Sequence, residues 1–293
     1  MSVAIGYVPG AFGQGGDNPD FLKDLVDLGD RYEYDSIWLS DRIVSDSFNL
    51  EPIVALSMIA AYSERMKFGT SVLALPLRNP VILAKQIATL DYLSKGRFFP
   101  AVGLGQEDPG EYEACGVPKG DRGRRTDEAI RLMRMLWEED NVTYEGEFFT
   151  CHDGSISPKT YLKPSPPVWI GGRSMAAARR VGGVGDGWLV SSATTQEVSL
   201  GRNVVFDTAD KADREKELEK KKKGETDKPN KVGSALKKPF TGFFDTIKTF
   251  FGNIYLLHFV YRRFLPFFSL FLILVFYYKF HDEANLQCVE MKF

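Results

Sequence analysis

Two glycines followed by an arginine and a serine are the best candidate in this sequence for binding an anion. Gly171, Gly172, Arg173 and Ser174 follow an apolar run and precede a segment with helical spacing. Glycine lets the backbone approach a ligand closely, and the first turn of a helix offers unpaired N–H groups at its positive end. We therefore predict that these residues bind a cofactor phosphate, although a plain strand-to-helix turn would use the same glycines.

A second glycine pair stands at the end of another apolar run. Gly103 and Gly105 follow residues 98–102, which are strongly apolar. Such a pair fits either a tight turn or a close approach of the backbone to a cofactor. The spacing alone leaves both interpretations open.

An acidic residue ends a third apolar run. Asp41 follows residues 36–40 and precedes Arg42. We interpret Asp41 as an exposed acid that contacts a cofactor or substrate. The alternatives are an ion pair with Arg42 and a helix cap.

The elements that must position these residues are clearest in residues 69–105, which predict one βαβ unit. An apolar run is followed by Asn79 and Pro80, which suit the cap and the first position of a helix. Apolar residues then recur at helical spacing until residues 94–96, and a second apolar run follows. Similar alternation between residues 3 and 190 predicts parallel strands in a barrel or an open doubly wound sheet. In a barrel, the carboxyl ends of the strands form the site.

Phrases on both sides of this unit occur in the order and at the spacing of a known family. They are DSIWLSDRI (35–43), EPIVAL (51–56), RGRRTDEAIRLMRMLW (122–137), PPVWIGG (166–172) and GDGWL (185–189). Over about two thirds of its length the chain resembles the luciferase-like monooxygenases, which are flavin- or coenzyme F-420-dependent (β/α)8 barrels. Within that family it is most similar to the deazaflavin-type oxidoreductases.

The resemblance implies a TIM-barrel fold and a cofactor, coenzyme F-420 or FMN, that serves hydride transfer or monooxygenation of a small organic substrate. It places a bulge with a non-prolyl cis peptide at Ser71-Val72, against the tricyclic ring. It also places the turn at Gly103 and Gly105 beside the cofactor, with Gln106 next to it.

Two positions depart from the family pattern. Related dehydrogenases often carry Asp-His where this chain has Asp41-Arg42, and some use a glutamic acid where it has Gln106. Arginine cannot act as a base near neutral pH, and glutamine cannot donate a carboxylic proton. The resemblance therefore argues against the sugar-phosphate dehydrogenase branch, and we assign no catalytic residue.

Composition excludes several other classes of function. The formal net charge is −2, which gives no indication of nucleic-acid binding. The three cysteines are far apart, and the three histidines all lie beyond residue 150, so no metal site is predicted. The separated cysteines suit a reducing compartment, and we expect the barrel in the cytoplasm.

The barrel predicted from these patterns is incomplete. A (β/α)8 barrel needs about 250 residues, whereas the strand pattern stops after six βα units near residue 190. We predict a truncated barrel domain over 1–195 and a Lys-rich flexible linker over 196–238. Residues 239–293 are predicted as a hydrophobic, helical tail with an amphipathic helix and a candidate transmembrane segment at 264–278.

The tail leaves several alternatives open. It could associate with a membrane and leave the barrel on the cytoplasmic side, it could dock on the barrel in place of the missing elements, or it could be foreign sequence. The family's last two strands supply part of the phosphate grip, so a second hypothesis is a catalytically impaired, membrane-tethered remnant. A partner or a homodimer would cover the apolar surface that missing strands expose.

Overall fold

A computed structural model describes residues 4–9, 18–222, 274–275 and 287–292 of the chain. Two compact units are distinguished, Met1–Glu215 with Phe271–Phe293, and Lys216–Leu270. Of the second unit only residues 216–222, the end of one helix, are described. The account below therefore concerns the first unit.

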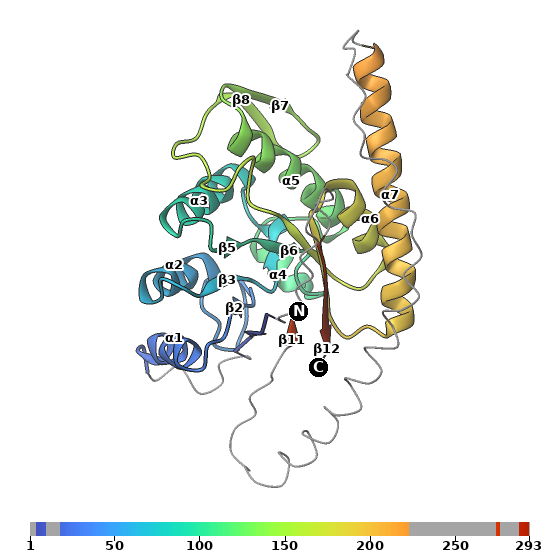
Figure 1. Cartoon of the computed structure of the whole chain (residues 1–293). Coiled ribbons are helices and arrows are strands. Elements are labelled where there is room, and N and C mark those ends of the chain that lie inside the picture. Colours follow the sequence, from blue (N-terminus) through green and yellow to red (C-terminus); the bar gives the residue numbers. More distant parts are fainter. Residues whose placement is uncertain (1–3, 10–17, 223–273, 276–286, 293) are drawn as a thin grey trace. The chain divides into compact units, whose positions relative to one another are not determined.

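Parallel strands in chain order form the centre of this unit (Figure 1). Two hydrogen-bonded sheets run β1-β2-β3-β5 and β11-β12-β10-β9-β6-β4, and every described pair in them is parallel except β11 with β12. Since β3 continues into β4 and β5 into β6, the two sheets share two interrupted strands. The strands are β1 (Gly6–Tyr7), β2 (Ser36–Leu39), β3 (Lys67–Thr70), β4 (Leu73–Ala74), β5 (Phe98–Phe99), β6 (Ala101–Gly103), β9 (Trp169–Gly171), β10 (Gly187–Val190), β11 (Leu274–Val275) and β12 (Gln287–Lys292).

Helices follow the strands and begin where the sequence offers caps. Asn79 accepts hydrogen bonds from the N–H groups of Val81 and Ile82, and Pro80 is the first residue of its helix, as predicted. A short helix from Pro109 lies in the stretch 106–120, which the sequence pattern did not identify as helical. The helices are α1 (Phe21–Arg31), α2 (Pro52–Tyr62), α3 (Pro80–Leu93), α4 (Pro109–Ala114), α5 (Arg122–Glu138), α6 (Met175–Val184) and α7 (Thr195–Lys222), with 3-10 turns η1 (Leu75–Leu77) and η2 (Lys119–Asp121).

A β-hairpin lies between α5 and β9. Its strands β7 (Val142–Glu145) and β8 (Thr150–Gly154) pair in antiparallel fashion. The buried Glu128 of α5 holds the turn, because its carboxylate accepts the N–H groups of Glu147, Phe148 and Phe149.

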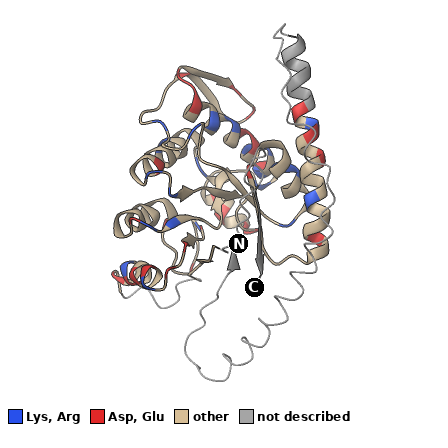
Figure 2. Ribbon diagram, viewed as in Figure 1, with Lys and Arg blue, Asp and Glu red and all other residues tan. Residues whose placement is uncertain are grey.

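Apolar side chains form two buried clusters. The larger one joins the strands to helices α1, α2, α3, α5 and α6. The smaller consists of Trp38, Phe99, Ala101, Trp169 and Leu189, with Val8 and Val72 packed against it. The rings of Trp38 and Trp169 stack at a centroid distance of 5.5 Å. Figure 2 shows acidic and basic residues interspersed along α1, α5 and α7, in keeping with the net charge near zero.

Helix α7 corrects the prediction of a flexible linker for residues 196–222, and the rest of the predicted linker, 223–238, lies outside the described residues. Thr195–Lys222 form one helix. Its first turns carry apolar side chains: Val205 is buried in the larger cluster, and Val198 and Val204 pack against it. The helix passes close to α6, because a Cβ atom built on Gly182 would lie 2.3 Å from the Val205 carbonyl oxygen. The lysine-rich composition of the predicted linker masked this apolar spacing.

The described part of the tail is extended rather than helical. Strand β12 pairs in parallel with β10, with Gln287 opposite Gly187 and Glu290 opposite Val190, and β11 pairs with β12. A strand edge presents unpaired N–H and C=O groups that a further strand can satisfy. Of the three alternatives for the tail, docking on the barrel is the one that agrees with the pairing of residues 287–292.

The predicted transmembrane segment 264–278 is wrong at the residues that can be compared, since Leu274 and Val275 form β11. The remainder of that segment and the predicted amphipathic helix lie outside the described residues. Within the described ranges, no helix combines the length and the apolar character needed to cross a membrane.

Candidate functional site

The strand formed by β3 and β4 is interrupted at Ser71 and Val72. The peptide bond between these two residues is cis, as the resemblance predicts. Thr70, to which the sequence assigned no role, bridges the gap in the ladder. Its Oγ1 donates to the Ala101 carbonyl oxygen (2.6 Å) and accepts from the Ala101 N–H (3.0 Å). The Ser71 N–H donates to the Leu39 carbonyl oxygen at 2.7 Å. We call residues 71–72 the bulge.

The Val72 side chain lies between two of the predicted glycines. A Cβ atom built on Gly103 would lie 2.5 Å from Val72 Cγ2, and one built on Gly171 would lie 2.5 Å from Val72 Cγ1. Real Cβ atoms do not approach so closely, so both positions need glycine. These glycines therefore make room for Val72, and their predicted contact with a cofactor stays a prediction.

Asp41 differs from its prediction as an exposed acid. Its side chain is 1% exposed, and its ion-pair partner is Arg78 rather than Arg42. Arg78 Nη2 lies 2.9 and 3.0 Å from the two carboxylate oxygens, and the Ala74 N–H donates to Oδ2 at 2.9 Å. Burial raises the pKa of Asp41, and the Arg78 cation and the Ala74 N–H partly offset that effect. The carboxylate is thus bound to the protein itself.

Arg78 also ties a second loop to this place. Its Nη1 donates to Glu51 Oε1 at 2.8 Å, and Glu51 caps α2 by accepting the Val54 N–H at 2.8 Å. Arg78 comes directly after η1, so one guanidinium joins the loops that follow β2 and β4. Sequence reasoning missed Arg78.

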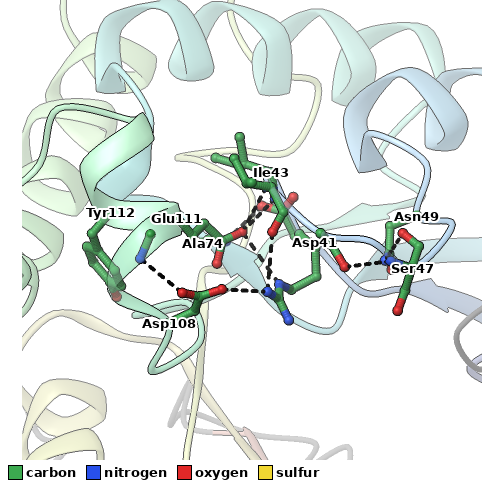
Figure 3. Close-up of polar contacts among 12 residues, drawn as sticks. Asp41, Ile43, Ser47, Asn49, Ala74, Asp108, Glu111 and Tyr112 are labelled. Atoms are coloured by element: carbon green, nitrogen blue, oxygen red, sulfur yellow. Dashed lines mark hydrogen bonds and ion pairs between the residues drawn. The ribbon is translucent and has the colours of Figure 1, made fainter.

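Arg42 lies in a separate ionic cluster around a buried glutamate. Glu111 of α4 is 1% exposed, and its Oε1 accepts the N–H groups of Ile43 (2.7 Å) and Val44 (3.3 Å). Arg42 Nε lies 3.5 Å from the same oxygen, and Arg42 Nη2 lies 3.6 Å from Asp108 Oδ2. Figure 3 shows Glu111 and Asp108 near Ile43, Asp41 and Ala74. Because α4 was not predicted, the sequence offered no reason to expect Glu111 near Arg42.

The turn after β6 exposes Gly105 and Gln106. Gly105 has a φ of 84°, in the left-handed region that favours glycine. The next residue, Glu107, pairs with Lys119 (2.7 Å) and Arg122 (3.2 Å). The hydrogen bond from Lys119 is the main cause of a lowered pKa of Glu107. Glu107 is therefore ionised and cannot replace the missing proton donor.

The turn after β9 places Gly172, Arg173 and Ser174 at the start of α6. Gly172 has a φ of 117°, and its carbonyl oxygen accepts the Trp188 Nε1–H at 2.7 Å. Arg173 is exposed, and its Nη1 donates to the Ser192 carbonyl oxygen at 3.0 Å. Ser174 caps α6 by accepting the Ala177 N–H at 3.1 Å. Its hydroxyl thus already serves the helix.

The structure brings most of the predicted residues to the carboxyl ends of β2, β3, β6 and β9. Val72 directly joins Gly103 to Gly171, and Asp41 reaches the same segment through Ala74. Gly105, Gln106, Gly172, Arg173 and Ser174 follow these strands. Among the residues whose positions are described, no group of His, Cys, Asp and Glu could hold a metal ion.

Comparison with known proteins identifies the family of this arrangement. A family model described as luciferase-like monooxygenase matches residues 1–220, beyond the predicted domain end at 195. The F420-dependent glucose-6-phosphate dehydrogenase of Kineococcus radiotolerans is 32% identical over 182 residues, 59% of this chain and 53% of the relative. The FMNH2-dependent dimethylsulfone monooxygenase of Pseudomonas putida is 29% identical over 185 residues, 61% of this chain and 50% of the relative. The chain thus spans about half the length of these curated relatives.

Two solved structures have folds similar to the fold of this chain. A monooxygenase from Streptomyces bottropensis has a TM-score of 0.63 at 24% identity, covering 72% of this chain and 67% of its own. An F420-dependent secondary alcohol dehydrogenase in complex with an F420–acetone adduct has a TM-score of 0.62 at 24% identity, covering 73% and 65%. With the match of the family model over residues 1–220, these findings show that the chain belongs to the luciferase-like monooxygenase family.

Proposed function

We propose that this protein is an oxidoreductase that binds coenzyme F-420 or FMN at the carboxyl ends of its strands and acts on a small organic molecule. The observation that carries the proposal is the position of Val72, held between Gly103 and Gly171 on the bulge. Relatives named as F420-dependent and FMNH2-dependent enzymes support the choice of cofactors.

The residues present fit such a group. Val72 is half-buried and offers an apolar surface of the kind that the face of a flat ring system can cover. The amino end of α6, with the exposed Arg173, suits the phosphate of either cofactor. When bound, the cofactor supplies hydride or oxygen chemistry, while the protein orients it and excludes water.

The side chains argue against dehydrogenation of a sugar phosphate, although several matched relatives carry that name. Arg42 stands where the family's proton acceptor is expected, and its guanidinium faces Glu111 and Asp108. Gln106 stands where the proton donor is expected. Since neither side chain transfers a proton near neutral pH, we propose a reaction in which the protein supplies no proton through these two positions.

A titration tests the proposal. The full chain is titrated with coenzyme F-420 and with FMN, each oxidised and reduced, while cofactor and tryptophan fluorescence are followed. We expect saturable binding of at least one cofactor. A folded protein that binds none of the four forms would contradict the proposal.

The same experiment decides the second candidate, a catalytically impaired remnant. One observation favours it: β12 pairs with β10 after six βα units. A remnant would unfold cooperatively on heating, as followed by circular dichroism, yet bind none of these cofactors.

Association of the tail with a membrane rests on the sequence alone. We propose that the predicted amphipathic helix at residues 240–254, in which phenylalanines recur at helical spacing near Lys237, Lys238 and Lys248, contacts an anionic membrane and leaves the barrel on the cytoplasmic side. Flotation of the full chain with vesicles containing phosphatidylserine would show this. Absence of the protein from the floating fraction would refute it.

A further inference from the structure

We propose that Asp41 and Arg78 are positioning residues that hold the bulge in place, and that Asp41 serves the cofactor site in this way rather than by touching the cofactor. We call the ion pair of these two side chains, with the Ala74 N–H bound to it, the clamp. The inference rests on the proposed function of the site.

The clamp fixes the bulge against the end of β2. The Ser71 N–H donates to the carbonyl oxygen of Leu39, the last residue of β2. Two residues beyond Leu39, the Asp41 carboxylate accepts the Ala74 N–H at 2.9 Å. The segment 71–74 is therefore bonded at both of its ends to one short stretch of chain, and Val72 lies between the two bonds.

The other side of the bulge leaves little room for movement. Thr70 is bonded twice to Ala101, so the residue before the bulge is fixed to β6. A displaced Val72 side chain would press on Gly103 or Gly171, where its methyl groups already fill the space of a Cβ atom. Contacts with β2, β6 and β9 thus define the position of Val72. Among these contacts, the clamp is the one made by charged side chains.

The clamp keeps the Asp41 carboxylate buried and bound within the protein. Both carboxylate oxygens lie within 3.0 Å of Arg78 Nη2, Oδ2 also accepts the Ala74 N–H, and the side chain is 1% exposed. Removal of one partner of such a buried pair leaves the other charged and uncompensated. We therefore expect loss of either partner to move the bulge.

The chain offers a matched control for this proposal. Asp91 of α3 is also a fully buried carboxylate that accepts backbone N–H bonds, from Tyr161 (2.6 Å) and Leu162 (3.0 Å). It lies near the end of α3, close to residues that precede β9, and so away from the bulge. The substitutions Asp41→Asn and Asp91→Asn make the same chemical change at the two places.

The experiment measures the dissociation constant of the cofactor that the wild-type full chain binds, at a temperature where circular dichroism shows every variant folded. We expect Asp41→Asn and Arg78→Gln each to raise it about tenfold or more, because small misplacements of a binding surface have effects of this size. The double variant should bind no more weakly than the single ones, since both act on one bulge. Asp91→Asn should change the constant less than about twofold.

Different outcomes separate the competing explanations. If Asp41 contacted the cofactor directly, Arg78→Gln would free its carboxylate and leave binding intact, which would overturn the clamp. If Asp91→Asn weakened cofactor binding as much as Asp41→Asn does, general destabilisation of the protein would explain both results. If Asp41→Asn does not fold, Arg78→Lys takes its place, because lysine keeps the positive charge. Arg78→Lys should weaken cofactor binding less than Arg78→Gln does. It should still alter the absorption spectrum of the bound cofactor. A wild-type chain that binds no cofactor contradicts the proposed function itself, whereas wild-type binding that Asp41→Asn and Arg78→Gln leave unchanged contradicts only the clamp.

Discussion

The two ends of the strands use buried charge differently. At the amino ends, charged side chains bind the protein's own backbone. Asp91 accepts two N–H groups from the segment before β9, and Arg97, which precedes β5, donates to four carbonyl groups. Those carbonyls belong to Ala60, Ser63, Met66 and Ser94. This end of the sheet is closed by side chains that hold loops and helices together.

At the carboxyl ends, charge instead supports a surface. The clamp holds the bulge, two glycines accommodate Val72, and Gln106 and Arg173 stay exposed. In barrels of this kind, stability resides at the amino ends and chemistry at the carboxyl ends. The comparison teaches that a buried ion pair alone does not reveal its role, because both ends contain buried charge. The difference lies in the segment that the buried charge holds. At the amino ends this segment connects two elements, and at the carboxyl ends it forms an exposed surface.

Among changes at the amino ends of the strands, Arg97→Ala is expected to have the largest effect on stability. Loss of its bonds to four carbonyl groups should lower the free energy of unfolding by about 3 kcal/mol or more, as measured by urea denaturation. The dissociation constant of the cofactor for the folded protein should stay unchanged. A variant that remains folded but loses the cofactor would remove the distinction between the two ends.

Gly171→Ala is the corresponding change at the carboxyl ends. Its Cβ would lie 2.5 Å from Val72 Cγ1, so we expect the bulge to shift and cofactor affinity to fall about a hundredfold. The double variant Gly171→Ala/Val72→Ala removes the clash and should recover part of the stability. Gly183→Ala in α6 is the control, since a Cβ there meets nothing within 4 Å. Unchanged binding by Gly171→Ala would show that Val72 is not part of the site.

A smaller effect concerns the pH dependence of stability at the amino ends. Burial raises the pKa of Asp91 above its ordinary value. A carboxyl group whose pKa is raised on folding stabilises the protein below its unfolded pKa, and that contribution is lost as the pH rises through the folded pKa. Asp91→Asn removes this loss, so the stability of the variant relative to wild type should rise as the pH increases from about 4, the ordinary pKa of an aspartic acid. Urea unfolding at several pH values measures it, and a relative stability that falls over this range would be the wrong sign.

Local patterns predicted what depends on neighbours along the chain. The cap at Asn79, the helix that Pro80 begins and the order of strands and helices follow from spacing and turn residues. The resemblance placed the cis peptide at Ser71-Val72 correctly. These features need no knowledge of which distant residues meet.

Features that depend on distant contacts could not be predicted in this way. Arg78, the partner of Asp41, is 37 residues away in the sequence, and Arg42 next to Asp41 was the obvious but wrong candidate. The reason for glycine at 103 and 171 is a valine on another strand. Strand β12 pairs with β10, a strand about 100 residues earlier, although it lies in the segment 239–293 that was predicted as a hydrophobic, helical tail.

Hydrogen–deuterium exchange of the full chain with and without cofactor tests the central claim most directly. We predict that saturating coenzyme F-420 or FMN slows amide exchange in residues 71–74, 103–106 and 171–174. Exchange in residues 91–97 and 160–164, at the amino ends, should stay unchanged. Protection confined to the amino ends, or no protection at a cofactor concentration that saturates binding, would contradict a cofactor site at the carboxyl ends of the strands.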